Sequence, residues 1–288
     1  MFLVLSMIFV VIGWALGTFF FNDWIIGALI FLMLAAAMNL ISYFFSSKIV
    51  LWSYHARIVT EKEAPRLYRI VRYVSGLHDM PMPKVAIVPT KTPNAFATGR
   101  NPKNAVVAAT EGILGILNDD ELTGVISHEM SHVRDRDILV MSVAATVAGA
   151  ISFMARIFTW NMFLGGGNRR NSNGSDLLIL IVVAITAPIA ALLVQLSISR
   201  SREYKADFVG ARTIGKPGSL ADALQKLEKA NAKRPITQGN PASSSLFIVN
   251  PFRGSSLFSL FSTHPPIEKR VKILRDMASG KIPMYEGG

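Results

Sequence analysis

The sequence predicts an α-helical membrane protein whose polar part is an α+β domain assembled from two separated sequence blocks. Three observations lead to this prediction. The chain of 288 residues is 51% hydrophobic and has a mean hydropathy of +0.38, so part of it is expected to lie in lipid. Four long apolar stretches interrupt the sequence. The remaining residues form two polar blocks, 46–137 and 200–288, which contain short β-type runs and helical segments.

The first two apolar stretches, Met1–Phe21 and Trp24–Phe45, contain no charged side chain and flank the turn-forming pair Asn22-Asp23. Each is about as long as the roughly 20 apolar residues that a helix needs to cross a bilayer. The first lacks the basic start and the small-residue cleavage site of a secretory signal. We therefore expect residues 1–45 to form a transmembrane hairpin.

The other two apolar stretches, Ile138–Phe158 and Leu177–Ser199, are joined by a polar link rich in Gly, Asn and Ser. Both reach spanning length, so residues 138–199 are expected to contribute two further spans. The alternative is a pair of helices buried in the core of a soluble domain. If all four stretches span the bilayer, the two polar blocks lie on the same side of it.

Charge and composition indicate whether the basic residues face a membrane surface or a nucleic acid. The formal charge is +11, and of the 30 Lys and Arg residues only Arg156, Arg169 and Arg170 fall outside the two polar blocks. Excess basic residues near membrane ends mark the cytoplasmic side, so we expect both blocks to be cytoplasmic, close to the anionic lipid of the cell (inner) membrane. The sequence has no RNA-binding aromatic motif or DNA-reading helix, which argues against a nucleic-acid partner. The absence of cysteine excludes disulfides, thiolate metal sites and a cysteine nucleophile.

The first polar block, residues 46–137, is predicted to be α+β. Val85–Val88 and Ala105–Ala109 are short β-type runs bounded by Pro, Asn and Gly. Asn118–Glu121 predicts the start of a helix, because acidic residues there match the helix dipole. Apolar residues follow at helical spacing, so the next residues are expected to form an amphipathic helix.

That predicted helix carries a candidate metal site. His128 and His132 are four residues apart, so both imidazoles lie on one helix face and can bind one zinc ion. Glu129 follows the first of them, which puts its carboxylate beside the metal, where it can take a proton from water. The alternative is two surface histidines at a chance helical spacing.

A catalytic zinc ion needs a third protein ligand, and no further histidine follows closely. The second polar block, residues 200–288, offers Glu203, with Asp207 four residues later on the same helix face. We predict that Glu203 binds the metal and that Asp207 accepts the second ring N–H of a ligating histidine. The alternative is two solvated acids, but two intervening spans return the chain to the same side of the membrane. His55 and His78 belong to no motif and are interpreted as surface or packing residues.

The two motifs together resemble a known family. His-Glu-Met-Ser-His at residues 128–132, followed by Ser-Arg-Glu-Tyr-Lys-Ala-Asp at residues 201–207, is similar to the signature of HtpX-type membrane metalloproteases, relatives of the CAAX prenyl endopeptidase. The resemblance covers nearly the whole chain. It implies a zincin-like (gluzincin) catalytic domain built from both blocks, with one zinc ion per chain on His128, His132 and Glu203.

The resemblance also implies a substrate-binding strand. Pro93–Gly99 is similar to the family's active-site edge strand, which holds an extended substrate through backbone hydrogen bonds. From the residues alone a plain loop stays open. The substrate-binding residues implied in this way are Asn94, Ala95, Phe96 and Ala97.

A C-terminal segment, Thr263–Arg270, is similar to another motif of the family. The resemblance implies that His264 and Arg270 lie near the scissile carbonyl and stabilise the oxyanion of the tetrahedral state. From the residues alone, Pro265 and Pro266 are suited to open a helix, with His264 merely capping it.

The resulting functional prediction is a membrane-anchored zinc endopeptidase that cleaves cytoplasmic regions of misfolded or damaged membrane proteins, as in membrane quality control during stress. One alternative is a CAAX-type prenyl-protein protease, although four spans are few for an enclosed chamber. Another is an inactive scaffold that holds zinc, which would not need Glu129. A metal transporter is disfavoured, because no His, Asp or Glu lies within the apolar stretches.

Overall fold

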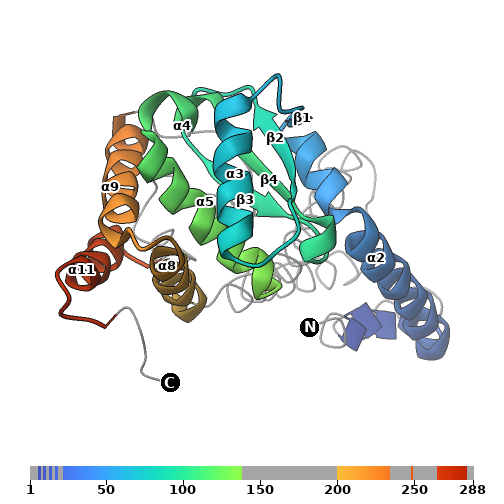
Figure 1. Ribbon diagram of the computed structural model, residues 1–288. Helices are drawn as coiled ribbons and strands as arrows, with labels where there is room; N and C mark the ends of the chain where they lie inside the picture. Colours follow the sequence, from blue (N-terminus) through green and yellow to red (C-terminus); the bar gives the residue numbers. More distant parts are fainter. Residues whose placement is uncertain are drawn as a thin grey trace. The chain divides into compact units, whose positions relative to one another are not determined.

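The computed structural model describes residues 6–7, 9–10, 13–14, 17–18, 22–137, 200–233, 248 and 265–283 (Figure 1). The chain divides into two compact units. The first comprises Met1–Phe45 and Val143–Val194, and the second comprises Ser46–Ser142 and Gln195–Gly288. The predicted spans Ile138–Phe158 and Leu177–Ser199 fall outside the described residues.

Helix α2 (Trp24–Ser53) begins in the first unit, directly after the predicted turn. Asn22 has a left-handed φ of 52°, and the carboxylate of Asp23 accepts the N–H of Ile25 at 2.8 Å, which caps the first turn of the helix. Trp24–Phe45 is the one helical segment in the described part of the chain that is long and apolar enough to cross a membrane. The first predicted span, Met1–Phe21, is described only in part.

Glycines allow close backbone contact inside this first unit. A Cβ atom added to Gly17 would lie 2.6 Å from the Cα of Gly27, and one added to Gly13 would lie 2.5 Å from the Gly27 carbonyl oxygen. Both distances are shorter than any real contact of a Cβ atom. The described residues of the first stretch therefore pack against α2 through small residues, as is common between membrane helices.

The second unit contains a four-stranded sheet in the order β1-β2-β4-β3. Its strands are β1 (Arg57–Ile58), β2 (Lys84–Val88), β3 (Ala95–Thr98) and β4 (Val106–Thr110). β2 and β4 are parallel, whereas β1 and β3 run antiparallel to their neighbours. The runs predicted at Val85–Val88 and Ala105–Ala109 are confirmed as strands. The segment Pro93–Gly99, for which a plain loop was the alternative, contains the edge strand β3.

Both faces of the sheet are covered. Val85 and Val107 point into the main core, which also contains apolar side chains of α3 (Pro65–Leu77). On the other face, Phe96 and Ala108 pack with Val50 near the end of α2. The alternation follows from the two-residue period of a strand and explains why nearly every residue of β2 and β4 is apolar.

Helix α5 (Asp119–Arg134) runs through the middle of this unit. Asn118 and Glu121 form a capping box, in which each side chain accepts the backbone N–H of the other residue, so the predicted helix start is confirmed. Asp135 follows as the C-cap, and Arg136 has a left-handed φ of 59°. The helix therefore stops before residue 138 instead of continuing straight into the next apolar stretch.

The second sequence block adds α8 (Arg200–Ile214), α9 (Pro217–Lys233) and α11 (Ile267–Ala278). α8 and α9 contact α5, which itself contacts α3 and β3, and α11 packs on α9 and α8. In Figure 1 these three helices lie on one side of α5 and the sheet lies on the other. α5 is thus buried between the two sequence blocks, where its side chains meet residues from both.

Candidate metal centre

Three potential metal ligands converge where α5 and α8 pack together. His128 and His132 lie on α5 and Glu203 lies on α8, all three are buried, and one ligand atom from each lies within 4.8 Å of the others. Nε2 of His128 is 3.7 Å from Oε2 of Glu203, and Nε2 of His132 is 3.3 Å from Oε1. Ligand atoms on tetrahedral zinc, with bonds of about 2.0–2.1 Å, are roughly 3.3–3.4 Å apart, so the donor set fits this metal.

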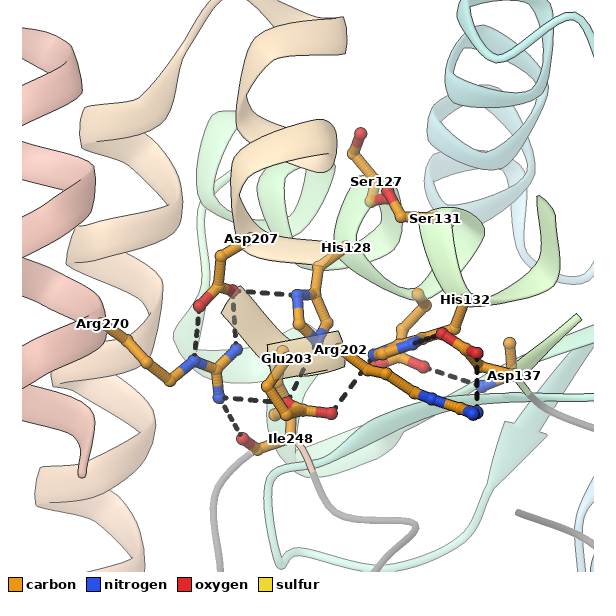
Figure 2. Close-up of polar contacts among 12 residues, drawn as sticks. Ser127, His128, Ser131, His132, Asp137, Arg202, Glu203, Asp207, Ile248 and Arg270 are labelled. Atoms are coloured by element: carbon orange, nitrogen blue, oxygen red, sulfur yellow. Dashed lines mark hydrogen bonds and ion pairs between the residues drawn. The ribbon is translucent and has the colours of Figure 1, made fainter. Parts of the chain in front are cut away.

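The second ring nitrogen of His128 faces Asp207, as Figure 2 shows. Nδ1 is 2.9 Å from Oδ1 of Asp207, an ion-pair contact that is not aligned as a hydrogen bond. Arg270 holds the same carboxylate with two hydrogen bonds, of 2.6 Å from Nε and 2.7 Å from Nη2. Burial raises the pKa of Asp207, but the charge and hydrogen bonds of Arg270 outweigh it and the pKa is lowered. Asp207 is therefore a carboxylate that supports His128.

His132 has an analogous partner that the sequence analysis missed. Its Nδ1 atom is 3.3 Å from Oδ2 of Asp137, whose Oδ1 accepts a 2.9 Å hydrogen bond from Arg202. Burial lowers the pKa of His132, but contacts with Asp137 and Glu203 outweigh it and raise the pKa to about 10. The carboxylates around this ring thus favour a positive charge, which a bound divalent cation supplies in place of a proton.

Glu129 lies beside this cluster and is held by the edge strand. Its Oε2 atom accepts a 3.0 Å hydrogen bond from the backbone N–H of Ala97 in β3. Desolvation raises the pKa of Glu129, and His128 and His132 offset this only in part. A buried carboxyl group with a raised pKa binds a proton more readily than an ordinary one, which suits a general base.

The predicted substrate strand borders the site. Residues of an antiparallel pair alternately face the partner strand and face away from it. The N–H of Thr110 in β4 donates to the Asn94 carbonyl at 2.9 Å, so Asn94 and Phe96 face β4. Ala95 and Ala97 therefore turn their N–H groups to the other edge, as the bond from Ala97 to Glu129 demonstrates.

Arg270 and Asn94 both contact Ile248, a buried residue of the second block. Arg270 donates to the Ile248 carbonyl at 3.0 Å, and the Asn94 side chain accepts the Ile248 N–H at 3.2 Å. Two of the three guanidinium nitrogens of Arg270 are engaged by Asp207 and the third by Ile248. Its oxyanion role stays a prediction, as does that of His264, which lies outside the described residues.

Behind the ligands, α5 and α8 are in backbone contact. A Cβ atom on Gly210 would lie 2.9 Å from the backbone nitrogen of His128, and the Ser127 hydroxyl donates to the Gly210 carbonyl at 2.8 Å. Because that hydroxyl has one hydrogen, Nε2 of His78 must be the donor in its 2.9 Å bond to Ser127. Burial lowers the pKa of His78 to about 4, so it is a neutral, buried residue that braces the ligand helix, consistent with the packing role expected for it.

The chain is similar in sequence to a known protein family and to several named proteins. The model of the family described as Peptidase family M48 matches residues 61–278. The chain is 54% identical over 269 residues to a protein named Protease HtpX homolog from Thermococcus sibiricus, covering 93% of this chain and 90% of the relative. A protein of the same name from Methanocaldococcus jannaschii is 50% identical over 253 residues, which is 86% of this chain and 88% of that protein.

A crystal structure of S. mikatae Ste24p is similar in fold, with a TM-score of 0.50. The sequence identity is 17%, and the match covers 92% of this chain but 61% of the Ste24p chain. At this level of identity, the likeness is one of overall fold.

Proposed function

Since the chain belongs to peptidase family M48 and is a metalloprotease, we propose that it is a membrane-anchored zinc endopeptidase with His128, His132 and Glu203 as the metal ligands. One observation carries the proposal. Two imidazoles and a carboxylate converge in a buried cluster, and Glu129 lies beside them with its carboxylate hydrogen-bonded to the edge strand. Three protein ligands would leave one coordination position free, which a catalytic zinc site needs and a structural one does not.

The residues divide the chemistry between them. His128, His132 and Glu203 would hold the zinc ion, which would supply a Lewis acid for the peptide carbonyl and for water. Glu129 takes the proton from the attacking water and later delivers it to the leaving amine. Asp207 and Asp137 orient the rings of His128 and His132, so that each Nε2 lone pair faces the metal position.

The substrate is an extended peptide that adds a strand to the open edge of β3. The hydrogen bond between Asn94 and Thr110 supports this. Since Asn94 faces β4, the next residue, Ala95, directs its N–H away from β4 to the open edge. Backbone pairing of this kind recognises the peptide bond and not its side chains, so it suits a protease with many substrates. Arg270 positions Asp207, and the oxyanion role of Arg270 and His264 is proposed from the resemblance alone.

Membrane anchoring is proposed from the apolar sequence. Trp24–Phe45 is long and apolar enough to span, and the sequence patterns of 1–21, 138–158 and 177–199 add three further spans. With both polar blocks cytoplasmic, the substrates are cytoplasmic regions of membrane proteins, with misfolded or damaged ones as the class. Comparing membrane proteomes of cells that carry the active chain or Glu129→Gln tests this role, and an unchanged set of membrane proteins would contradict it.

Replacing the base tests the enzymatic proposal most directly. Glu129→Gln in the purified full chain is expected to keep about one zinc ion and to lose casein hydrolysis by roughly 10²–10⁴-fold, the usual contribution of a general base. Glu228→Gln, which changes an exposed carboxyl group on α9, is the matched control and is expected to stay active. Normal hydrolysis by Glu129→Gln would rule out the mechanism, and zinc without hydrolysis in the unaltered chain would favour an inactive scaffold.

A further inference from the structure

Two ion pairs join the chain just before the long apolar insert, residues 138–199, to the chain just after it. Asp135 pairs with Lys205 at 2.6 Å, and Asp137 pairs with Arg202 at 2.9 Å. The acids follow the end of α5 at Arg134, and the basic residues lie in the first turns of α8, which begins at Arg200. The two ends of the insert are therefore held next to each other by side chains of opposite charge.

The two pairs differ in what else they touch. Oδ1 of Asp137 accepts from Arg202, and Oδ2 of the same carboxylate is 3.3 Å from Nδ1 of His132 (Figure 2). A carboxylate only accepts hydrogen bonds, so Nδ1 of His132 is the donor to Asp137, which leaves Nε2, the atom beside Glu203, as the one that would bind the metal. In the part of the chain that the structure describes, the carboxylate of Asp135 pairs with Lys205 and Arg134 and contacts no predicted ligand.

Asp137 lies outside α5, which ends at Arg134. Arg136, with its left-handed φ of 59°, separates Asp137 from the last turn of α5. By contrast, Asp207 sits inside α8 and is fixed by two hydrogen bonds from the fully buried Arg270. Among the described residues of the second sequence block, the partly exposed side chain of Arg202 is the one that pairs with Asp137, and Asp137 in turn contacts Nδ1 of His132.

We propose that Asp137 and Arg202 form a clasp, which ties the two ends of the apolar insert together and holds the His132 ring in the orientation that binds the metal. Arg202 is a positioning residue in this view: it reaches the metal only through Asp137. The clasp rests on the proposed zinc function. It also links the positions of the two ends of the insert, residues 138–199, to the orientation of the ligand His132. Separating the ends of the insert would remove the acceptor that fixes the His132 tautomer, and metal affinity would fall.

The test measures zinc affinity of the full chain by competition with a chelator of known affinity. Arg202→Gln is expected to weaken zinc binding by about tenfold, the lower range for residues that orient metal ligands, and Arg202→Lys is expected to recover part of it. Lys205→Gln is the matched control, since it removes one positive charge from the neighbouring ion pair on the same helix. Its zinc affinity is expected to equal that of the unaltered chain.

A double substitution shows whether Arg202 acts through Asp137. Asp137→Asn alone is expected to weaken zinc binding about 10–100-fold, and adding Arg202→Gln to it is expected to weaken it no further. Equal affinities of Arg202→Gln and Lys205→Gln, or additive losses in the double variant, would overturn the clasp. An unaltered chain that binds no zinc would overturn the proposed function itself, so the two failures are distinguishable.

Discussion

The carboxylate of Glu129 accepts a hydrogen bond of 3.0 Å from the backbone N–H of Ala97. This bond joins the proposed general base to the strand that is proposed to bind substrate. Because the N–H of Ala97 faces the open edge of β3, a peptide added there lies directly beside the base. Under the proposed mechanism, the same few atoms align the substrate and transfer the proton.

The backbone donors of β3 are expected to matter more than its small side chains. Ala95→Pro deletes an N–H that faces the open edge and breaks no bond to β4, so peptide turnover should fall severely while zinc stays bound. Ala95→Gly keeps the donor and serves as the control. Casein hydrolysis and zinc content of both purified variants provide the measurement, and near-normal cleavage by Ala95→Pro would show that substrate does not pair with this strand.

The third ligand is expected to be needed for both metal and activity. Glu203→Ala removes a buried carboxylate from between His128 and His132, so the chain should lose zinc and hydrolysis together. Glu228→Ala, on the exposed face of α9, should change neither. Chelation of the unaltered chain should abolish hydrolysis, and added zinc should restore it. Full zinc content in Glu203→Ala would exclude Glu203 as a ligand.

The spacing of α5 and α8 is expected to set the geometry of the site. Gly210→Ala puts a Cβ atom 2.9 Å from the backbone nitrogen of His128, so α8 must move away and carry Glu203 with it. Zinc affinity should fall by at least tenfold, in the range found for residues that orient metal ligands. Gly76→Ala in α3 meets no atom within 4 Å and should leave zinc binding unchanged, with a gain in stability of about 0.5–1 kcal/mol. Equal zinc affinities of the two variants would contradict this prediction.

Membrane orientation can be measured by cysteine labelling, because the chain has no native cysteine. Ser127 is unsuitable as a position, since it is fully buried and donates to the Gly210 carbonyl. Single cysteines at the exposed positions Lys103 and Ser201 are expected to react only with reagent admitted to the cytoplasm. A cysteine at Ser172, in the predicted outer link, is expected to react from outside. Cytoplasmic labelling at Ser172 would show that 138–158 and 177–199 do not cross the membrane.

Local patterns in the sequence were sufficient to predict the features that depend on neighbouring residues. Asn118 and the acids after it predicted the start of α5, and the four-residue spacing of His128 and His132 predicted that both face one point. Glu203 was found because two predicted spans return the chain to the same side. Each of these predictions therefore rests on residues a few positions apart or on the number of predicted spans.

Contacts between distant segments left no such signal. Asp137 follows Arg136, whose left-handed φ is not signalled by a glycine or asparagine, and its partner Arg202 lies 65 residues further along the chain. Ile248 stands in a stretch rich in Ser, Gly and Pro, yet its backbone joins Arg270 to Asn94. These positions depend on how the two sequence blocks pack, which no local pattern records.

The division of the ligands between two sequence blocks also has a consequence for biosynthesis. A ribosome delivers His128, Glu129 and His132 on α5 before the apolar insert, and Glu203 on α8 only after it. A nascent chain therefore holds two metal ligands until the insert has been translated. Under the proposed mechanism it cannot hydrolyse a peptide at this stage, so the newly made protease cannot digest its neighbours before its own membrane segment has emerged.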